Sequence, residues 1–254
     1  MRRHLGSLPI QVLAYFTLLE LMLVAAILYW PNFRDNIDSL RALSGPIPAL
    51  QDMLTQLEET GVVGYITGQH FFKGCNTLGC AAAVLFAVGA VAGEVHRGTL
   101  EIWLARPISR GRLLTERWVA GALALGLPIF ASTATIPLLA DRVDEVVDLA
   151  PMFLCAVHEW IFLLAIYSLS FLLSAVGSHP TKIALLVLFL STFEFAIYMV
   201  KVWTQSSLFR LADIQDFVDI ESARRLDWAI LAPLLACIAV LYAAALFAFR
   251  RRVP

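Results

Sequence analysis

Three carboxylates and one histidine lie within otherwise apolar stretches of the sequence, where titratable groups are rare. They are Glu20, the adjacent pair His158 and Glu159, and Glu194. A charged acid at the centre of a lipid bilayer costs roughly 2.5–3.5 kcal/mol on insertion scales, so such groups usually face a protein interior, a cavity or a partner. We therefore expect these four residues to line a substrate path or to take part in gating.

Each of these residues also has a structural alternative. Glu194 could stay protonated and hydrogen-bond a neighbouring helix, and Glu20 could form a packing contact in a dimer. His158 and Glu159 could lie shallow enough to reach water. The pair does not form the HExxH motif of metalloproteases, because Phe162 occupies the position of the second histidine.

Other kinds of catalytic or cofactor site are not indicated. A nucleotide-binding P-loop needs a lysine followed by serine or threonine, yet Lys73, Lys182 and Lys201 are followed by glycine, isoleucine and valine. The four cysteines lie in or beside apolar runs, without CxxC or Cys/His spacing for a metal. We predict a non-catalytic chain that binds no cofactor, metal or nucleic acid.

The composition places these residues in a membrane protein. Hydrophobic residues make up 59% and charged residues 15% of the chain, with a mean hydropathy of +0.76, far from the values of soluble domains. Runs of about 20 apolar residues, long enough to cross a bilayer as helices, predict an all-α, polytopic bundle in a single domain over residues 1–254. The six predicted spans are Ile10 to Trp30, Phe71 to Gly93, Leu114 to Leu139, Pro151 to Val176, Ile183 to Trp203 and Trp228 to Phe249.

The charges between the spans divide into two groups. Arginines gather at the N-terminus, after the second span and at the C-terminus, whereas the other three connections are rich in aspartate and glutamate. Lysine and arginine that flank spans stay on the cytoplasmic side. We therefore predict that both termini and the loop after the second span face the cytoplasm, in a prokaryotic-type cytoplasmic membrane.

Two outer connections show helical periodicity. In residues 47–59, Leu50, Met53, Leu54 and Leu57 follow the i, i+3, i+4, i+7 spacing of an amphipathic helix. Residues 211–219 interleave apolar and aspartate residues in a similar way. We predict a lid of short helices on the outer face, with plain connecting loops as the alternative.

The loop after the second span predicts a short amphipathic helix on the cytoplasmic surface. Leu100, Trp103 and Leu104 share one face of it, and Glu101 points away. A solvated basic turn with Trp103 anchored at the lipid interface is the alternative.

Three residues mark the limits of this helix. Gly98 supplies a flexible entry, and Pro107 disfavours helical geometry at Arg106 and so ends the helix. Ser109 is well placed to cap the helix that becomes the third span.

The order of residues in this loop resembles the signature of ABC-2 type transporter permeases. The chain is most similar to the permeases related to the one encoded with nitrous oxide reductase maturation factors. Weaker similarities lie at Ser170 to Ala184 and at Phe249 to Arg252, where Val253 replaces the acid usual in that family. The matching residues are Glu94, Arg97, Gly98, Thr99, Leu100, Glu101, Leu104, Pro107, Ile108, Ser109, Arg110, Leu113 and Leu114.

The resemblance implies a coupling helix that sits in a groove of an ATPase. Leu100, Trp103 and Leu104 would form its buried face, while Glu101, Arg106 and Arg110 would pair with charges on the ATPase. The residues assigned to ATPase coupling are Glu94, Arg97, Gly98, Thr99, Leu100, Glu101, Trp103, Leu104, Arg106, Pro107, Ser109 and Arg110.

The resemblance also implies partners. The chain would pair with a second permease copy, identical or paralogous, and with two ABC ATP-binding subunits that hold ATP and Mg²⁺. Membrane lipid surrounds such a chain, and an accessory protein could bind its outer face.

Three functional classes remain open. The first is an ATP-driven permease, most consistent with export. The second is a mechanical transmitter, in which the same ATPase drives an event on an outer-face partner without moving a solute. The third is an ATP-independent secondary carrier or intramembrane enzyme that uses Glu20, Glu159 and Glu194.

Overall fold

All regular structure in the described part of the chain is helical. The computed structural model describes residues 4–43, 57, 59–105, 107–200 and 202–252. Six helical segments are long and apolar enough to cross a membrane, which confirms the predicted all-α architecture with six spans. They are Leu8–Asp35, Glu59–Ala90, Arg110–Val143, Leu149–Val176, Pro180–Tyr198 and Trp228–Arg251.

The bounds of the spans differ from the prediction, most of all in the second span. The second begins at Glu59 rather than Phe71, and the fifth ends earlier, at Tyr198. Residues 59–70 include threonine, glutamine and histidine, which a search for apolar runs excludes. These polar side chains are tolerated because Thr67 and His70 are buried against neighbouring helices instead of facing lipid.

The core of the bundle forms around α8 (Leu149–Val176), which packs against α4 (Asn76–Ala90), α7 (Arg110–Ala140) and α11 (Trp228–Arg251). Two glycines of α7 allow α8 to approach that helix closely. A Cβ added at Gly121 would overlap Tyr167, and one at Gly126 would overlap the indole of Trp160. Small residues at membrane helix interfaces bring backbones together in this way.

Two of the less buried spans expose broad apolar faces. In α9 (Pro180–Tyr198) only 6% of the most apolar window is buried, against 72% in the second span. α1 (His4–Asp35) also exposes most of its side chains and continues through Pro31. The exposed leucine side chains on both helices, with exposed phenylalanines on α9, suit contact with lipid or another membrane chain.

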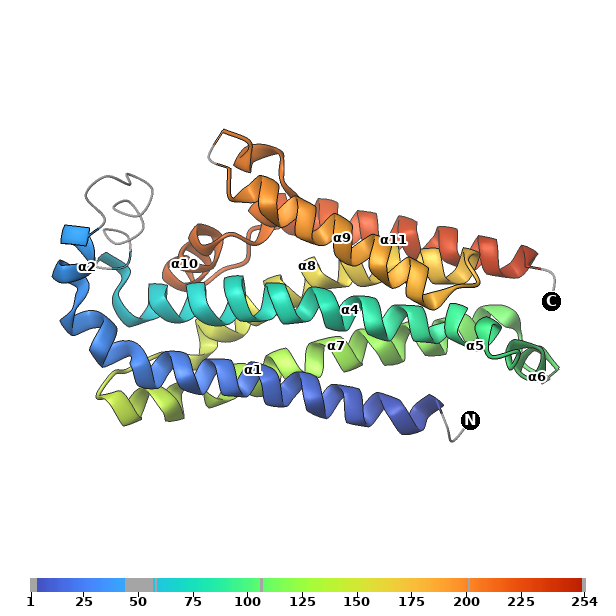
Figure 1. Cartoon of the computed structure of the whole chain (residues 1–254), viewed down its shortest axis with the longest axis horizontal. Helices are drawn as coiled ribbons and strands as arrows, with labels where there is room; N and C mark the ends of the chain where they lie inside the picture. Colours follow the sequence, from blue (N-terminus) through green and yellow to red (C-terminus); the bar gives the residue numbers. More distant parts are fainter. Residues whose placement is uncertain (1–3, 44–56, 58, 106, 201, 253–254) are drawn as a thin grey trace.

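Both termini lie at the same end of the bundle as α5 (Ala92–His96) and α6 (Leu100–Leu104), as Figure 1 shows. The opposite end carries α2 (Ile37–Leu43) and α10 (Ile214–Ala223). We refer to these as the α6 end and the α10 end.

The predicted outer helix around residues 211–219 is present as α10, preceded by the 3₁₀ helix η4 (Leu208–Ala212). Asp213 and Asp216 form a capping box at its start. Phe217 is fully buried, with its ring stacked on Phe71 at 5.2 Å between centroids. The other predicted outer helix, residues 47–59, lies almost entirely outside the described residues.

Candidate functional site

The buried carboxylate of Glu94 organises the α6 end. Its side chain is 4% exposed, and its Oε1 lies 3.0 Å from a guanidinium nitrogen of Arg97 and 3.9 Å from one of Arg117 on α7. The Thr99 hydroxyl donates to the Glu94 carboxylate, and the Thr99 amide donates to the Glu94 carbonyl at 2.9 Å. The Glu, Arg and Thr of the sequence motif therefore bond to one another within the chain.

Gly98 makes the turn between α5 and α6. Its φ of +67° lies in the left-handed region, where a side chain costs free energy and glycine does not. The Gly98 amide donates to the Val95 carbonyl at 2.9 Å and closes the turn. The expected entry to the coupling helix is thus a fixed turn that needs glycine.

The short helix α6 differs in part from the predicted surface. Leu100, expected on the face that a partner buries, is only 7% exposed and belongs to the core of this chain. Its burial follows from the tie between Thr99 and Glu94, which directs the start of α6 against the bundle. Glu101 is exposed as expected, and the side chain of Ile102, which sequence analysis did not select, is 65% exposed.

The structure leaves part of the predicted coupling segment undescribed. It does not describe the side chains of Trp103 and Leu104, or any part of Arg106. The expectation about their contacts stays a prediction.

The segment after α6 leads directly into α7. Ser109 caps α7 as predicted, its Oγ accepting from the Arg112 amide at 3.3 Å, and Pro107 is exposed. Arg110 donates to the carbonyl of Arg252 at 2.6 Å, so it joins the start of α7 to the end of α11.

The intramembrane acids Glu20 and Glu194 have hydrogen-bond partners in the chain. Glu20 on α1 accepts from the Thr135 hydroxyl of α7 at 3.2 Å and is half-buried. Glu194 on α9 accepts from the Leu208 amide at 3.1 Å, which attaches the start of η4 to the fifth span. The contact of Glu194 fits the structural alternative for this residue.

His158 and Glu159 are adjacent in sequence but face different parts of the bundle. The His158 ring donates from Nε2 to the Leu211 carbonyl at 2.7 Å and packs edge-on against Phe217 of α10. The Glu159 carboxyl is fully buried, and neither of its oxygens has a hydrogen-bond partner among the described residues. A buried, unpartnered carboxyl inside a spanning helix is a candidate functional group.

Sequence analysis missed a buried polar group beside these residues. This group lies at the π-helix η1 (Thr67–Cys75). There, His70 Nε2 lies 3.4 Å from the hydroxyls of Ser132 and Thr133. Asn76, at the end of η1, donates to the Ala212 carbonyl at 3.3 Å. π-helical turns occur frequently at functional sites. The available signal was the polar stretch just before the predicted start of the second span.

No group of three or more histidine, cysteine, aspartate or glutamate side chains that could hold a metal ion occurs in the described part of the chain. Cys75, Cys80 and Cys155 are buried free thiols, and Cys237 is exposed.

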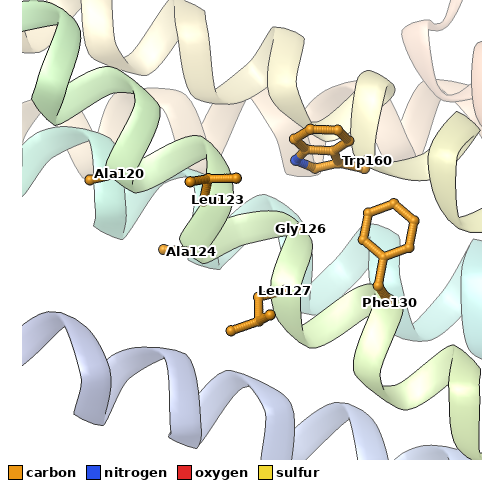
Figure 2. A pocket seen from close by; sticks show the side chains of 7 residues that line it. All are labelled: Ala120, Leu123, Ala124, Gly126, Leu127, Phe130 and Trp160. Atoms are coloured by element: carbon orange, nitrogen blue, oxygen red, sulfur yellow. The ribbon is translucent and has the colours of Figure 1, made fainter.

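Two apolar grooves follow the exposed side of α7. One, of about 450 Å³, is lined by residues of α7 and by Trp160, and Figure 2 shows the indole of Trp160, from α8, opposite the α7 side chains. The other, of about 590 Å³, lies between α1 and α7 and shares Leu127 with the first. None of the four intramembrane candidates lines either groove.

The pKa values of two aspartates at the α10 end are shifted in opposite directions. Partial burial, aided by the nearby charges of Asp213 and Asp219, raises the pKa of Asp216 to about 6. A hydrogen bond from the Ala150 amide and the charge of Arg224 lower the pKa of Asp148, which caps α8. At this end, burial therefore disfavours the charged form of Asp216, whereas its contacts favour the charged form of Asp148.

The chain was compared with known proteins. A family model described as "ABC-2 family transporter protein" matches residues 16–252. No curated protein matches the chain.

Proposed function

The chain belongs to the ABC-2 family of transporter proteins and is a multi-pass membrane permease subunit of an ABC transporter; from this premise we propose how it assembles and works. It pairs with a second permease copy and with two separate ATP-binding subunits, which hold ATP and Mg²⁺. The ATPases dock at the α6 end, and ATP-driven movement there rearranges the bundle to export a substrate. The chain acts as one transmembrane domain over residues 1–254.

The observation that carries this proposal is the position of α6. It lies at the end of the bundle that holds both termini (Figure 1), and its surface includes exposed Glu101 and Ile102. The buried Glu94 carboxylate fixes its start to α5 and α7. A short helix that is held at its base and exposed at its surface suits force transfer from a partner.

The charge of the two ends supports a cytoplasmic α6 end. Arg97, Arg110 and Arg112 lie at the α6 end. At the α10 end, aspartate and glutamate outnumber lysine and arginine. Arginine beside a span is retained on the cytoplasmic side of a bacterial inner membrane. We therefore assign the α6 end to the cytoplasm and the α10 end to the outer face, which is open to an accessory protein.

The intramembrane residues take different roles in the proposal. Glu159 is the strongest candidate for a substrate path or gate because it is buried without a hydrogen-bond partner among the described residues. His158 faces elsewhere and connects α8 to η4 and to Phe217 of α10. Glu20 lies on the half-exposed seam between α1 and α7, while Glu194 acts mainly in holding η4.

The motif from Glu94 to Leu114 supports a closer relationship within the family. We place the chain with the permeases related to the one encoded with nitrous oxide reductase maturation factors. Transport assays on the assembled complex would identify the chemical class of the cargo.

The proposal is tested by charge reversal in α6. Glu101→Arg should lower the ATPase recovered with the tagged permease by about tenfold or more, since a like charge or a lost pair at an interface costs several kcal/mol. Glu116→Arg is the matched control, because Glu116 is exposed on α7 near the same end and pairs only weakly with Arg112. Deletion of Thr99 to Pro107 should abolish recovery.

Three outcomes separate the functional classes. Unchanged ATPase recovery in both α6 variants would overturn the proposal. Transport that persists in proteoliposomes without ATP would favour a secondary carrier. ATPase binding together with a stoichiometric outer-face protein, and no solute moved, would favour the mechanical transmitter.

A further inference from the structure

The second spanning helix is broken at one residue near the α6 end. α4 ends at Ala90, Val91 has φ −126° and ψ −59°, and α5 begins at Ala92. The Glu94 amide donates to the Val91 carbonyl at 3.0 Å, in place of the Ala90 carbonyl that a continuous α-helix would use. The break leaves backbone groups on both sides of Val91 that need other partners.

Ser174 of α8 supplies the partners for three of these groups. Its Oγ accepts from the amides of Val91 at 3.3 Å and Ala92 at 2.9 Å. Its hydroxyl donates to the Val88 carbonyl at 3.3 Å, and the residue is fully buried. A neighbouring helix thus repairs the break, which is the condition for non-helical backbone at membrane depth.

Arg117 of α7 supplies a partner for another backbone group at the break. Its guanidinium donates to the Ala90 carbonyl, which the break releases, and lies 3.9 Å from the carboxylate of Glu94 in α5. One side chain of α7 therefore contacts the helix before and after the break.

The chain on either side of the break is held firmly. Below it, the bonds of Glu94 to Arg97 and Thr99 join α5 to the start of α6. Above it, Ala83 and Ala87 of α4 are fully buried in the bundle. The break joins two well-packed units through a single non-helical residue.

We propose that the break at Val91 is the hinge on which α5 and α6 move as one unit relative to α4, with Ser174 as the positioning residue that carries this movement to α8. This inference rests on the proposed docking of an ATPase at the α6 end. Movement of the unit changes the contacts of the Val91 and Ala92 amides with Ser174, and α8 carries the change along its axis to His158 and Glu159.

The test is hydrogen exchange of the permease with its co-purified ATPase in lipid nanodiscs. Exchange is compared without nucleotide and after trapping with ATP and orthovanadate. In the wild type, peptides that contain Val91 and Ala92 should change exchange rate by about fivefold or more between the two states. Peptides from α4 around Ala83 should not change.

Variants at Ser174 show whether its hydroxyl couples the movement. Ser174→Ala should raise exchange at Val91 and Ala92 about fivefold without nucleotide, since one net hydrogen bond is worth about 1 kcal/mol, and should remove most of the difference between states. Ser174→Thr should restore that difference. Ser170→Ala is the matched control, because within the described part of the chain the Ser170 hydroxyl bonds only to the Ile166 carbonyl of its own helix.

The outcomes distinguish this proposal from the one on which it rests. ATPase bound to the wild type with exchange at Val91 and Ala92 that does not depend on nucleotide would overturn the hinge alone. A Ser174→Ala complex that keeps the full difference between states would overturn the role of Ser174. Absence of an ATPase from the wild-type preparation would overturn the proposed function and the hinge together.

Discussion

The α6 end and the α10 end each carry a short helix, but they attach it to the bundle in different ways. α6 is held at its base by the polar contacts of Glu94 and leaves Glu101 and Ile102 exposed. α10 inserts the Phe217 ring between Phe71 and His158 and begins with a capping box. The difference indicates that the α10 end closes the bundle by apolar packing, while the α6 end keeps an exposed surface, to which the proposed function assigns the ATPase.

The two kinds of attachment also differ in how they respond to force. An apolar ring in a packed core loses its contacts over a short displacement and resists movement. Charged groups around Glu94 can tilt with the backbone and keep their partners, since their side chains are long. The α6 end can therefore move as a unit without being released from the bundle.

The largest effect is expected at the α10 end. Phe217→Ala should destabilise the packing of α10 by about 3–5 kcal/mol, because it removes a fully buried ring. Thermal unfolding of the purified protein in detergent, together with hydrogen exchange of α10, measures the loss. Leu208→Ala, at a side chain that is 56% exposed, should change stability by less than about 0.5 kcal/mol. Equal effects of the two variants would contradict the tight closure of this end.

At the α6 end, Glu94→Ala should cost about 2 kcal/mol and detach α6. The variant removes an acceptor for charged and neutral donors and leaves Arg117, 18% exposed, with fewer partners. ATPase recovery and unfolding temperature should both fall. Glu116→Ala, which removes an exposed acid from α7, should leave both unchanged, and a fall of similar size there would argue against a special role for Glu94.

A smaller effect is expected at the turn before α6. Gly98→Val should cost about 1–2 kcal/mol, because a branched side chain is disfavoured at a φ of +67°. Gly98→Asn should cost less, since asparagine tolerates this region. ATPase recovery from matched amounts of the two variants tests the difference. Similar losses in both would show that the turn is not what positions α6.

The smallest effect is a pH response at the α10 end. The pKa of Asp216 is raised on folding from its ordinary value near 3.8 to about 6. Its contribution to stability is therefore fully present below about pH 4 and is lost as the pH rises through 6. Lowering the pH from 7 to 5 should increase the protection of α10 amides, measured relative to their intrinsic exchange rates at each pH, by about 1 kcal/mol or less because the carboxyl is partly exposed.

Two comparisons check the pH response. Asp216→Asn should remove it. The α8 cap at Asp148, whose pKa is lowered, should instead be unchanged between pH 7 and 5, and should weaken only as the pH falls below the usual pKa of aspartate. A uniform response of both segments would contradict the assignment.

Sequence patterns predicted the features that depend on local chemistry. The six spans follow from run length, because bilayer thickness fixes how many apolar residues a helix needs. The turn at Gly98, the cap at Ser109 and the helix α10 follow from local backbone preferences and periodicity.

Features that depend on distant partners were not predictable. The break at Val91 depends on Ser174, which lies on another spanning helix. Leu100 shares a helix face with Trp103 in sequence, yet tertiary packing buries it in the chain's own core. His158 and Glu159 separate because neighbouring residues of a helix point about 100° apart.

The π-helix η1 makes the number of residues in the second span matter as much as its length. Its backbone bonds join residues five apart, as from the Asn76 amide to the Phe71 carbonyl. Loss of one residue there would let the stretch close as an ordinary α-helix and rotate one half of the span by about 100° against the other. His70 would turn away from Ser132 and Thr133 while Asn76 kept its place. A single-residue deletion would therefore exchange which side chains line the bundle interior.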